Sequence, residues 1–359
     1  MKNLKCLFLL ILPFCTGLVI AQAAAVDENP VTSRNIDPMQ TYWGDIDGFL
    51  NRQAQASLDV VQELLRQFPP SLDETLERQA AMMLLDNVLH DEKAPHRPSV
   101  QEFFHDRMNL LASELETTWV TTGAMIWKLY DHGFVVRTPS VTLLFDFTRA
   151  YSSGDDSFAI PDQLAFRILE QCDAMFVTHR HRDHADAWAA AEFINLGKPV
   201  IAPKSVFPEE SFNQDLTRLE RSTDKKHLLS LQGGKSISVT AFPGHQGATL
   251  ENNVYLVTAP EGFTLLHTGD QSNSDDFSWI DTIGEKHDVD LLLPNCWTTD
   301  IERMAEGVSA QLLITGHENE LGHSIDHREP NWLTYDRLQE VKTPYILMTW
   351  GERYHFPGE

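Results

Sequence analysis

Apolar residues recur at helical spacing from Ile46 to Phe68, and the pattern stops at Pro69-Pro70. This periodicity predicts one long amphipathic helix. Two capping-box patterns follow, in which Glu stands three residues after Ser, at Ser71–Glu74 and at Ser99–Glu102. Each predicts the start of a further helix. Residues 24–118 therefore form a helical N-terminal region whose apolar stripes pack on one another and on the rest of the chain; a lid or a dimerising surface is the alternative.

From residue 119 onward the pattern changes to short apolar segments typical of strands, separated by amphipathic segments. Residues 161–171 and 331–341 have the spacing of outer helices, and residues 345–350 have the composition of a closing strand. This length, about 240 residues, is enough to build one large core. The pattern therefore predicts a single α/β domain over residues 119–359.

The densest group of candidate metal ligands follows the apolar, strand-like residues 174–177. Four of the six side chains in residues 179–184 can ligate a metal: His179, His181, Asp183 and His184. A strand that ends abruptly in a loop points each side chain in a different direction while it keeps their origins close together. A solvated polar turn is the alternative, but such a turn has no need for three histidines and an aspartate at this spacing. The stretch thus predicts a two-metal site, followed by a helix over residues 185–196.

The pattern His-x-His-x-Asp-His after a strand resembles the metallo-β-lactamase superfamily. Its continuation, Ala185-Asp186, is similar to that of a branch with ascorbate-6-phosphate lactonase and N-acylphosphatidylethanolamine phospholipase D. Residues 127–136 and 141–146 resemble the opening hairpin of that branch, with its Gly-His turn altered to Asp131-His132. The resemblance covers about residues 119–350, and it implies an αββα sandwich, the metallo-β-lactamase fold, for the catalytic domain.

The resemblance also implies how two metal ions are held. The implied ligands are His179, His181 and His245 on a first ion, Asp183, His184 and His317 on a second, and Asp270 between the two. Each candidate follows a strand-like segment, as His245 follows residues 236–241, and strand ends are where side chains from distant segments converge. The last ligand has a competitor, because His323 stands in the same loop as His317. With His317 as the ligand, His323 is expected to contact the substrate instead.

Four further residues are expected beside the ligands. Asp186 is predicted to accept an imidazole N–H and so to support the ligand loop. His132 and Asp146 are predicted behind the ligands or in the pocket, although a core histidine and a turn aspartate explain them equally well. Cys296 is expected near the same rim, as a pocket-lining residue or as an inert buried thiol. Cys172 and Cys296 are expected at opposite sheet edges, too far apart for a disulfide.

The chain begins with Lys2 and Lys5, an apolar run at residues 7–20 and the small residues Ala21-Gln22-Ala23. This order is typical of a secretory signal peptide over residues 1–23, so the mature protein is expected in the periplasm or outside the cell. A membrane anchor is the alternative, but the run is shorter than the ~20 apolar residues of a spanning helix and is interrupted by proline. No later segment is predicted to cross a membrane.

The sequence has 28 Lys+Arg against 52 Asp+Glu, a net charge of −24. Loss of residues 1–23 removes two lysines and no acid, which leaves a net charge of −26. Such a charge repels nucleic acid, and no basic stripe with interleaved aromatic residues compensates for it. It is compatible with a small-molecule or lipid-like substrate, even an anionic one, because two bound metal ions supply about four positive charges at the reaction centre. The oligomeric state is left open.

The sequence has no Gly-rich dinucleotide motif, no Gly-x-Ser-x-Gly elbow and no Walker loop, so the nucleophile is expected to come from metal-bound water. Two Zn²⁺ ions about 3.5 to 4 Å apart hold a bridging hydroxide and polarise the oxygen of an ester, lactone, amide or phosphodiester. Asp183 is the expected catalytic residue, because it would orient the hydroxide. The sequence thus predicts a secreted zinc-dependent hydrolase. An iron-dependent oxidative member of the superfamily and a non-catalytic, metal-stabilised binding protein are the alternatives.

Overall fold

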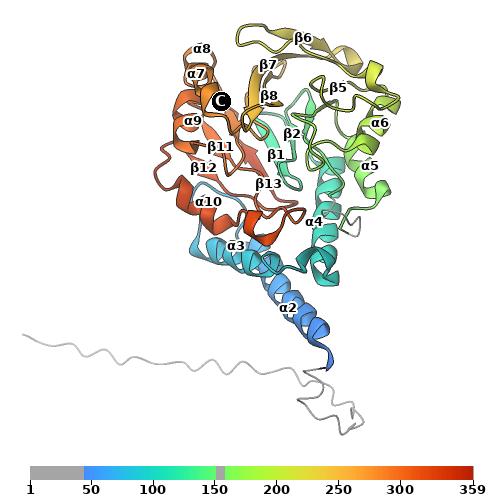
Figure 1. Ribbon diagram of the computed structural model, residues 1–359, viewed down its shortest axis with the longest axis vertical. Coiled ribbons are helices and arrows are strands. Elements are labelled where there is room, and N and C mark those ends of the chain that lie inside the picture. The colour runs from blue at the N-terminus through green and yellow to red at the C-terminus, as the bar shows by residue number, and fades with distance from the viewer. Residues whose placement is uncertain (1–43, 151–157, 359) are drawn as a thin grey trace, which may run out of the picture. The chain divides into compact units, whose positions relative to one another are not determined.

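Helices α2 (Ile46–Gln67), α3 (Leu76–Leu89) and α4 (Pro98–Thr117) open the part of the chain that the structure describes (Figure 1). The computed structural model describes residues 44–150 and 158–358, so the predicted signal peptide lies outside the described residues. Leu58, Val61 and Leu65 of α2 are buried, as its apolar periodicity predicts. No helix in these two ranges is long and apolar enough to cross a membrane.

The predicted starts of α3 and α4 were wrong by a few residues. In α3, Thr75 rather than Ser71 caps the helix, because its Oγ1 accepts a backbone N–H of the first turn at 3.3 Å. α4 begins at Pro98, which suits a first turn because proline lacks the N–H that would stay unpaired there. Ser99 therefore lies inside α4, and Oδ1 of Asn51 in α2 accepts its N–H at 3.1 Å and its O–H at 3.0 Å.

The strands form two sheets. The first sheet has the order β13-β1-β2-β3-β4-β5, and the second has the order β12-β11-β10-β9-β8-β7-β6. The strands of the first sheet are β1 (Ala124–Lys128), β2 (Phe134–Arg137), β3 (Thr142–Phe145), β4 (Ala174–Phe176), β5 (Val200–Ile201) and β13 (Arg353–Phe356). Those of the second are β6 (His227–Ser230), β7 (Ser236–Gln246), β8 (Leu250–Thr258), β9 (Thr264–His267), β10 (Leu291–Leu293), β11 (Leu312–Ile314) and β12 (Tyr345–Ile346).

Side chains along the strands alternate between two separate cores. Leu143 and Phe145 of β3 belong to the core between the sheets, together with Leu265 of β9. Leu144 and Leu266, their neighbours in the same strands, belong to the core that includes the helices. Because both faces of these strands are covered, both faces are apolar. The predicted αββα sandwich is thereby confirmed.

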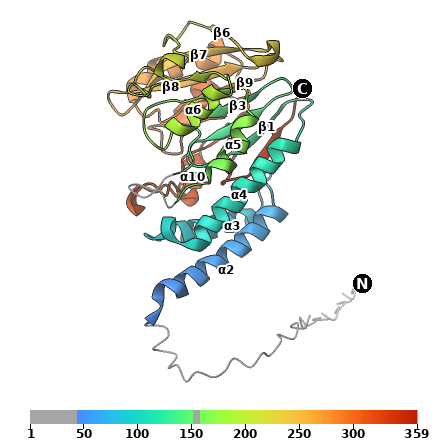
Figure 2. The same cartoon turned by 90° about the vertical axis from the view of Figure 1, so that its right-hand side faces the viewer.

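Helices cover the outer faces of the two sheets. α5 (Asp162–Glu170) and α6 (Ala187–Asn195) lie over the first sheet (Figure 2). The helices beside the second sheet are α7 (Phe277–Ile280), α8 (Ile283–Lys286), α9 (Ile301–Val308) and α10 (Asn331–Leu338) (Figure 1). The outer helices predicted at 161–171 and 331–341 therefore exist as α5 and α10. The predicted closing strand at 345–350 is limited to β12.

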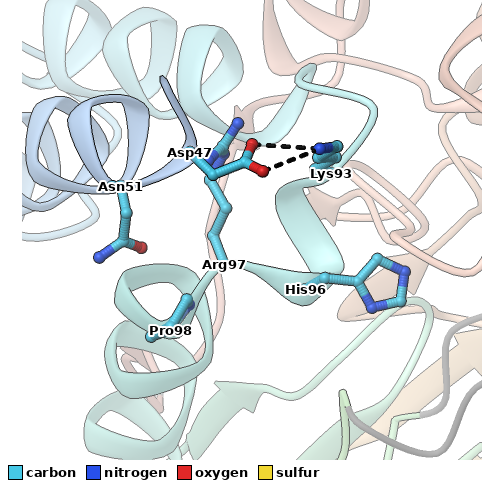
Figure 3. A pocket seen from close by; sticks show the side chains of 7 residues that line it. Asp47, Asn51, Lys93, His96, Arg97 and Pro98 are labelled. Atoms are coloured by element: carbon cyan, nitrogen blue, oxygen red, sulfur yellow. Dashed lines mark hydrogen bonds and ion pairs between the residues drawn. The ribbon is translucent and has the colours of Figure 1, made fainter. Parts of the chain in front are cut away.

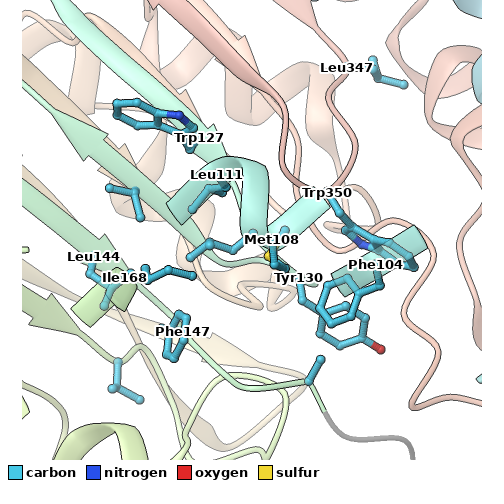
Figure 4. Packing of buried hydrophobic residues seen from close by; sticks show 14 of the residues in the cluster. Phe104, Met108, Leu111, Trp127, Tyr130, Leu144, Phe147, Ile168, Leu347 and Trp350 are labelled. Carbon is cyan, nitrogen blue, oxygen red and sulfur yellow. The ribbon is translucent and has the colours of Figure 1, made fainter. Parts of the chain in front are cut away.

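Helix α4 packs into the same core as the sandwich (Figure 4). The ring of Phe104 lies 4.9 Å from that of Phe158 and 5.2 Å from that of Trp350, measured between centroids. A buried ion pair at 2.7 Å also joins Arg78 of α3 to Glu352, just before β13. The described residues from Asp47 onward accordingly form one compact unit. The apolar stripes of the N-terminal helices thus pack on the sandwich, as their pattern predicts.

Candidate metal centre

Parallel strands bring six of the seven predicted ligands, all except His245, to one edge of the sandwich. β4 runs parallel to β3, and β9, β10 and β11 run parallel to one another. The loop after β4, the residues after β9 and those after β11 therefore meet where these strands end. In the loop after β4, the carbonyl of His181 accepts the N–H of His184 at 3.1 Å, so the loop turns back on itself.

Four side chains lie close together where the second metal ion was predicted: Asp183, His184, Asp270 and His317. We call this group the second cluster, after that ion. Nε2 of His184 lies 3.0 Å from Oδ2 of Asp183 and 3.2 Å from Oδ1 of Asp270. Nε2 of His317 lies 3.4 Å from each of the same two carboxylates and 3.4 Å from Nε2 of His184. Two imidazoles and two carboxylates around one point form a donor set that suits a divalent transition-metal ion.

The first cluster is formed by His179, His181 and Asp270. Nε2 of His179 lies 3.6 Å from Oδ2 of Asp270, whereas the other oxygen of Asp270 faces His184 and His317. Asp270 thus presents one oxygen to each cluster, which is the arrangement of a carboxylate that bridges two metal ions.

The donor atoms pass a test of fit for metal ions. Nε2 of His179 is buried and has no hydrogen-bond partner within the described ranges. Buried polar atoms are almost always paired, so an unpaired imidazole nitrogen that lies 3.6 Å from Oδ2 of Asp270 indicates a missing partner. A cation between these two atoms would satisfy both.

His245 lies outside both clusters. The sequence pattern placed it after a strand, but β7 continues to Gln246, and His245 pairs with Glu251 of β8 inside the hairpin. Its Nδ1 lies 2.9 Å from Oδ1 of Asp276, a residue that the sequence analysis did not single out. The adjacent Gln246 donates from Nε2 to Oδ2 of Asp270 at 3.0 Å, so the end of β7 does reach the bridging carboxylate. The assignment of His245 to the first ion stays a prediction.

Asp146 contacts the imidazole of His184 at the nitrogen that faces away from the second cluster. It follows β3, is fully buried, and its Oδ2 lies 2.7 Å from Nδ1 of His184. It also accepts the backbone N–H of Thr178 at 2.8 Å and the hydroxyl of Thr178 at 2.7 Å. With Nδ1 of His184 occupied in this way, Nε2 is left to face the second cluster.

The role predicted for Asp186 was wrong. Its carboxylate caps α6 by accepting the N–H of Ala189 at 3.2 Å, and it binds the guanidinium of Arg149, with Oδ2 2.9 Å from Nε. An aspartate just before a helix finds backbone N–H donors more readily than an imidazole. Asp146, from the neighbouring strand, supports the histidine instead.

Two other candidates lie behind the centre rather than at its surface. His132 is buried, and its ring centroid lies 4.3 Å from that of His267. A ring nitrogen of His132 also lies close to the donor atoms of Asp146 and His184. Cys296 is also buried, and its thiol is free, as is that of Cys172. The prediction that these cysteines form no disulfide is therefore confirmed. Burial raises the pKa of the Cys296 thiol well above its usual value, which makes it an inert thiol.

Glu320 links the two histidines that compete for the last ligand position. Its Oε2 lies 3.5 Å from Nδ1 of His317 and 2.8 Å from Nδ1 of His323. The side chain of His323 is 47% exposed, and no atom of it belongs to a cluster. The geometry therefore favours His317 as the ligand. Glu320 was missed in the sequence analysis, although its position three residues from each histidine is a usable signal.

Three imidazoles of the two clusters, those of His179, His184 and His317, have shifted pKa values. Burial, with a further contribution from the nearby His184, lowers the pKa of His179 to about 3. Burial also opposes protonation of His184, but the carboxylates of Asp270, Asp183 and Asp146 outweigh it and raise the pKa of His184 well above its usual value. The pKa of His317 is raised against burial in the same way, chiefly by Asp270 and Asp183.

This difference predicts proton release when metal binds. An ion bound by the second cluster would displace protons from His184 and His317, whose pKa values are raised, whereas the lowered pKa of His179 leaves that imidazole neutral at pH 7. Calorimetric titration with Zn²⁺ in buffers of different ionisation enthalpy should show about one to two protons released at the second site. Affinity there should fall as the pH drops from 8 to 6, because protonated imidazoles compete with the ion. A pH-independent second-site affinity would contradict this account.

The cavity in Figure 3 is separate from the metal centre. It has a volume of about 570 Å³ and lies beside α2 and the start of α4, where Nζ of Lys93 lies 3.1 Å from the carboxylate of Asp47. None of the cluster residues lines it. This cavity therefore does not mark the candidate site.

Comparison with solved structures supports the fold. The chain is similar to a possible metal-dependent hydrolase from Veillonella parvula, with a TM-score of 0.51 and 14% identity, over 66% of this chain and 100% of that one. It is also similar to a metallo hydrolase from the archaeon Ignicoccus hospitalis (TM-score 0.49, 15% identity, 66% and 100% covered). A third is the metallo-beta-lactamase fold protein YhfI from Bacillus subtilis (TM-score 0.45, 15% identity, 66% and 100% covered). No protein-family model and no curated protein matches the chain. At 14% identity, the similarity to the Veillonella parvula protein shows a shared fold.

Proposed function

We propose that this chain is a metal-dependent hydrolase of the metallo-β-lactamase superfamily with two metal ions per chain. The observation that carries the proposal is the placement of Asp270, whose two oxygens face different sets of imidazoles. A structural zinc site needs one closed set of four ligands. Such a site does not require a carboxylate that is shared between two sets of donors. This argues for catalysis rather than for a purely structural metal.

We propose Zn²⁺ as the metal, because imidazole nitrogens and carboxylate oxygens are donors that zinc readily accepts. When bound, two such ions supply a water nucleophile at neutral pH and polarise the oxygen of the scissile bond. The chain's own residues fix where this chemistry takes place. Asp146 orients His184, and Asp270 lies between the imidazoles of the two clusters.

Asp183 is the proposed proton carrier. Its side chain is 17% exposed, whereas that of Asp270 is 1% exposed, so Asp183 is the carboxylate that water and substrate can reach. Its carboxylate would accept the proton of the attacking water and pass it to the leaving group. The proposed substrates are small-molecule or lipid-like esters, lactones, amides or phosphodiesters, and the sequence pattern at residues 1–23 supports a periplasmic or secreted enzyme.

Metal analysis combined with a substrate panel tests this function. The purified mature chain should bind about two equivalents of Zn²⁺ and hydrolyse at least one generic ester or phosphodiester. A chelator should abolish turnover, and added Zn²⁺ should restore it. One iron per chain with oxygen-dependent turnover would sink the hydrolase proposal, and so would a chain that binds no metal at all.

A further inference from the structure

The loop that carries His317 has an unusual backbone. The φ angle is 79° at His317 and 56° at Asn319, both in the left-handed region that residues with side chains seldom adopt. This backbone directs Nε2 of His317 toward Asp183 and Asp270. Contacts that hold the loop in this conformation therefore also hold a donor of the second cluster.

Asp86 of α3 supplies such contacts from inside the protein. The residue is 4% exposed, and its carboxylate accepts four N–H groups from the loop and from the start of α10. Oδ1 accepts the side-chain N–H of Asn319 at 2.9 Å and the backbone and side-chain N–H of Asn331 at 2.9 and 2.8 Å. Oδ2 accepts the N–H of Trp332 at 3.0 Å. These four hydrogen bonds to one carboxylate connect α3 to the loop and to the start of α10.

Arg328 connects the C-terminal part of the loop to the end of α3. Its Nε donates to the carbonyl of His323 at 2.9 Å, and its Nη1 donates to the carbonyls of Leu89 and Asp91, each at 2.9 Å. The carbonyl of Arg328 in turn lies 2.8 Å from Nε2 of His90. The loop is thus fastened to α3 on both sides of Glu320.

We infer that Asp86 is a positioning residue for the metal centre and that α3 sets the affinity of the second cluster for its ion. Asp86 acts through Asn319, which stands two residues after His317 in the strained stretch. This role of the N-terminal helices differs from both alternatives given above, a lid and a dimerising surface. The inference rests on the proposed metal centre.

The variant Asp86→Asn tests this role, because it keeps the volume of the side chain but replaces one acceptor oxygen with an NH₂ group. Zn²⁺ affinity is measured by competition with a chromophoric chelator, which resolves two binding steps. We expect affinity at the second site to fall about 10- to 100-fold, the usual effect of losing a group that orients a ligand. Affinity at the first site should stay unchanged.

Asn51→Ala is the matched control. Asn51 also fastens two N-terminal elements together through Ser99, but it does not contact the loop. It should lower the unfolding temperature of the metal-free protein and leave both Zn²⁺ affinities as in the wild type. If Asp86→Asn behaves like this control, Asp86 is merely structural and the inference is overturned. A wild-type chain that binds no Zn²⁺ would instead overturn the proposed function.

Asn319→Gly keeps the inference testable if Asp86→Asn does not fold. Glycine adopts a φ of 56° without strain, so the backbone is tolerated while the hydrogen bond to Asp86 is lost. Second-site affinity should fall in this variant as well. An unchanged affinity would overturn the inference.

Discussion

Replacement of Asp183 by alanine is expected to abolish hydrolysis while the first cluster keeps its ion. Oδ2 of Asp183 lies 3.0 Å from Nε2 of His184 and 3.4 Å from Nε2 of His317, so the variant loses one of the four donors of the second cluster. It loses none of the first. A positioned acid–base group typically contributes about 10²- to 10⁴-fold to the rate. The fall in kcat/KM should be at least that large, because second-site occupancy also falls.

The measurements are kcat/KM and metal content of the same preparation. Asp186→Asn is the control from the same loop, since Asp186 caps α6 and binds Arg149 instead of joining a cluster. The control should lose stability and keep its metal ions. If Asp183→Ala loses all metal yet keeps its fold, the division of ligands between the two ions is wrong.

Replacement of His317 by alanine is expected to empty the second site, whereas replacement of His323 should spare it. Nε2 of His317 lies 3.4 Å from both carboxylates of the second cluster. His323 is instead held at its Nδ1 by Glu320 and is half exposed, which suits a residue that meets substrate. His323→Ala should therefore act on KM or on a proton-transfer step, with an effect of up to about 10²- to 10⁴-fold.

Zn²⁺ stoichiometry of the two variants decides between these roles. His317→Ala should bind about one equivalent and lose turnover, because two-metal hydrolysis needs both ions. His323→Ala should bind about two. The opposite result, in which His323→Ala loses the second ion and His317→Ala retains both, would reverse the assignment.

The sequence alone predicted features that depend on neighbours along the chain. The period of the apolar residues identified α2, α5 and α10, and short apolar segments indicated the strands of an α/β domain, which the resemblance to a known superfamily implied to be an αββα sandwich. The crowding of His179, His181, Asp183 and His184 predicted a metal site, because so many donors in one loop have no other simple use. The resemblance to a known superfamily then pointed to Asp270 and His317, which the parallel strands place beside that loop.

The tertiary structure decided what depends on partners distant in the chain. The backbone position of His245 depends on how far the β7–β8 hairpin pairs, and the pairing continues past His245 to Gln246. Whether Asp186 supports an imidazole depends on competing donors, and the N–H groups of α6 and Arg149 take its oxygens. Neither outcome is visible in the motif itself.

Asp86 is the clearest example of a residue whose contacts only the tertiary structure determined. Its sequence neighbourhood is that of an ordinary amphipathic helix, yet it binds Asn319, more than two hundred residues later. A periodic pattern records that a helix has a buried face, because burial of apolar area favours any apolar partner. It does not record which partner that face meets, because directional hydrogen bonds form only after the sheets and loops have been placed. The sequence therefore determined the fold class and the local metal motif, and the tertiary structure determined which groups orient the ligands.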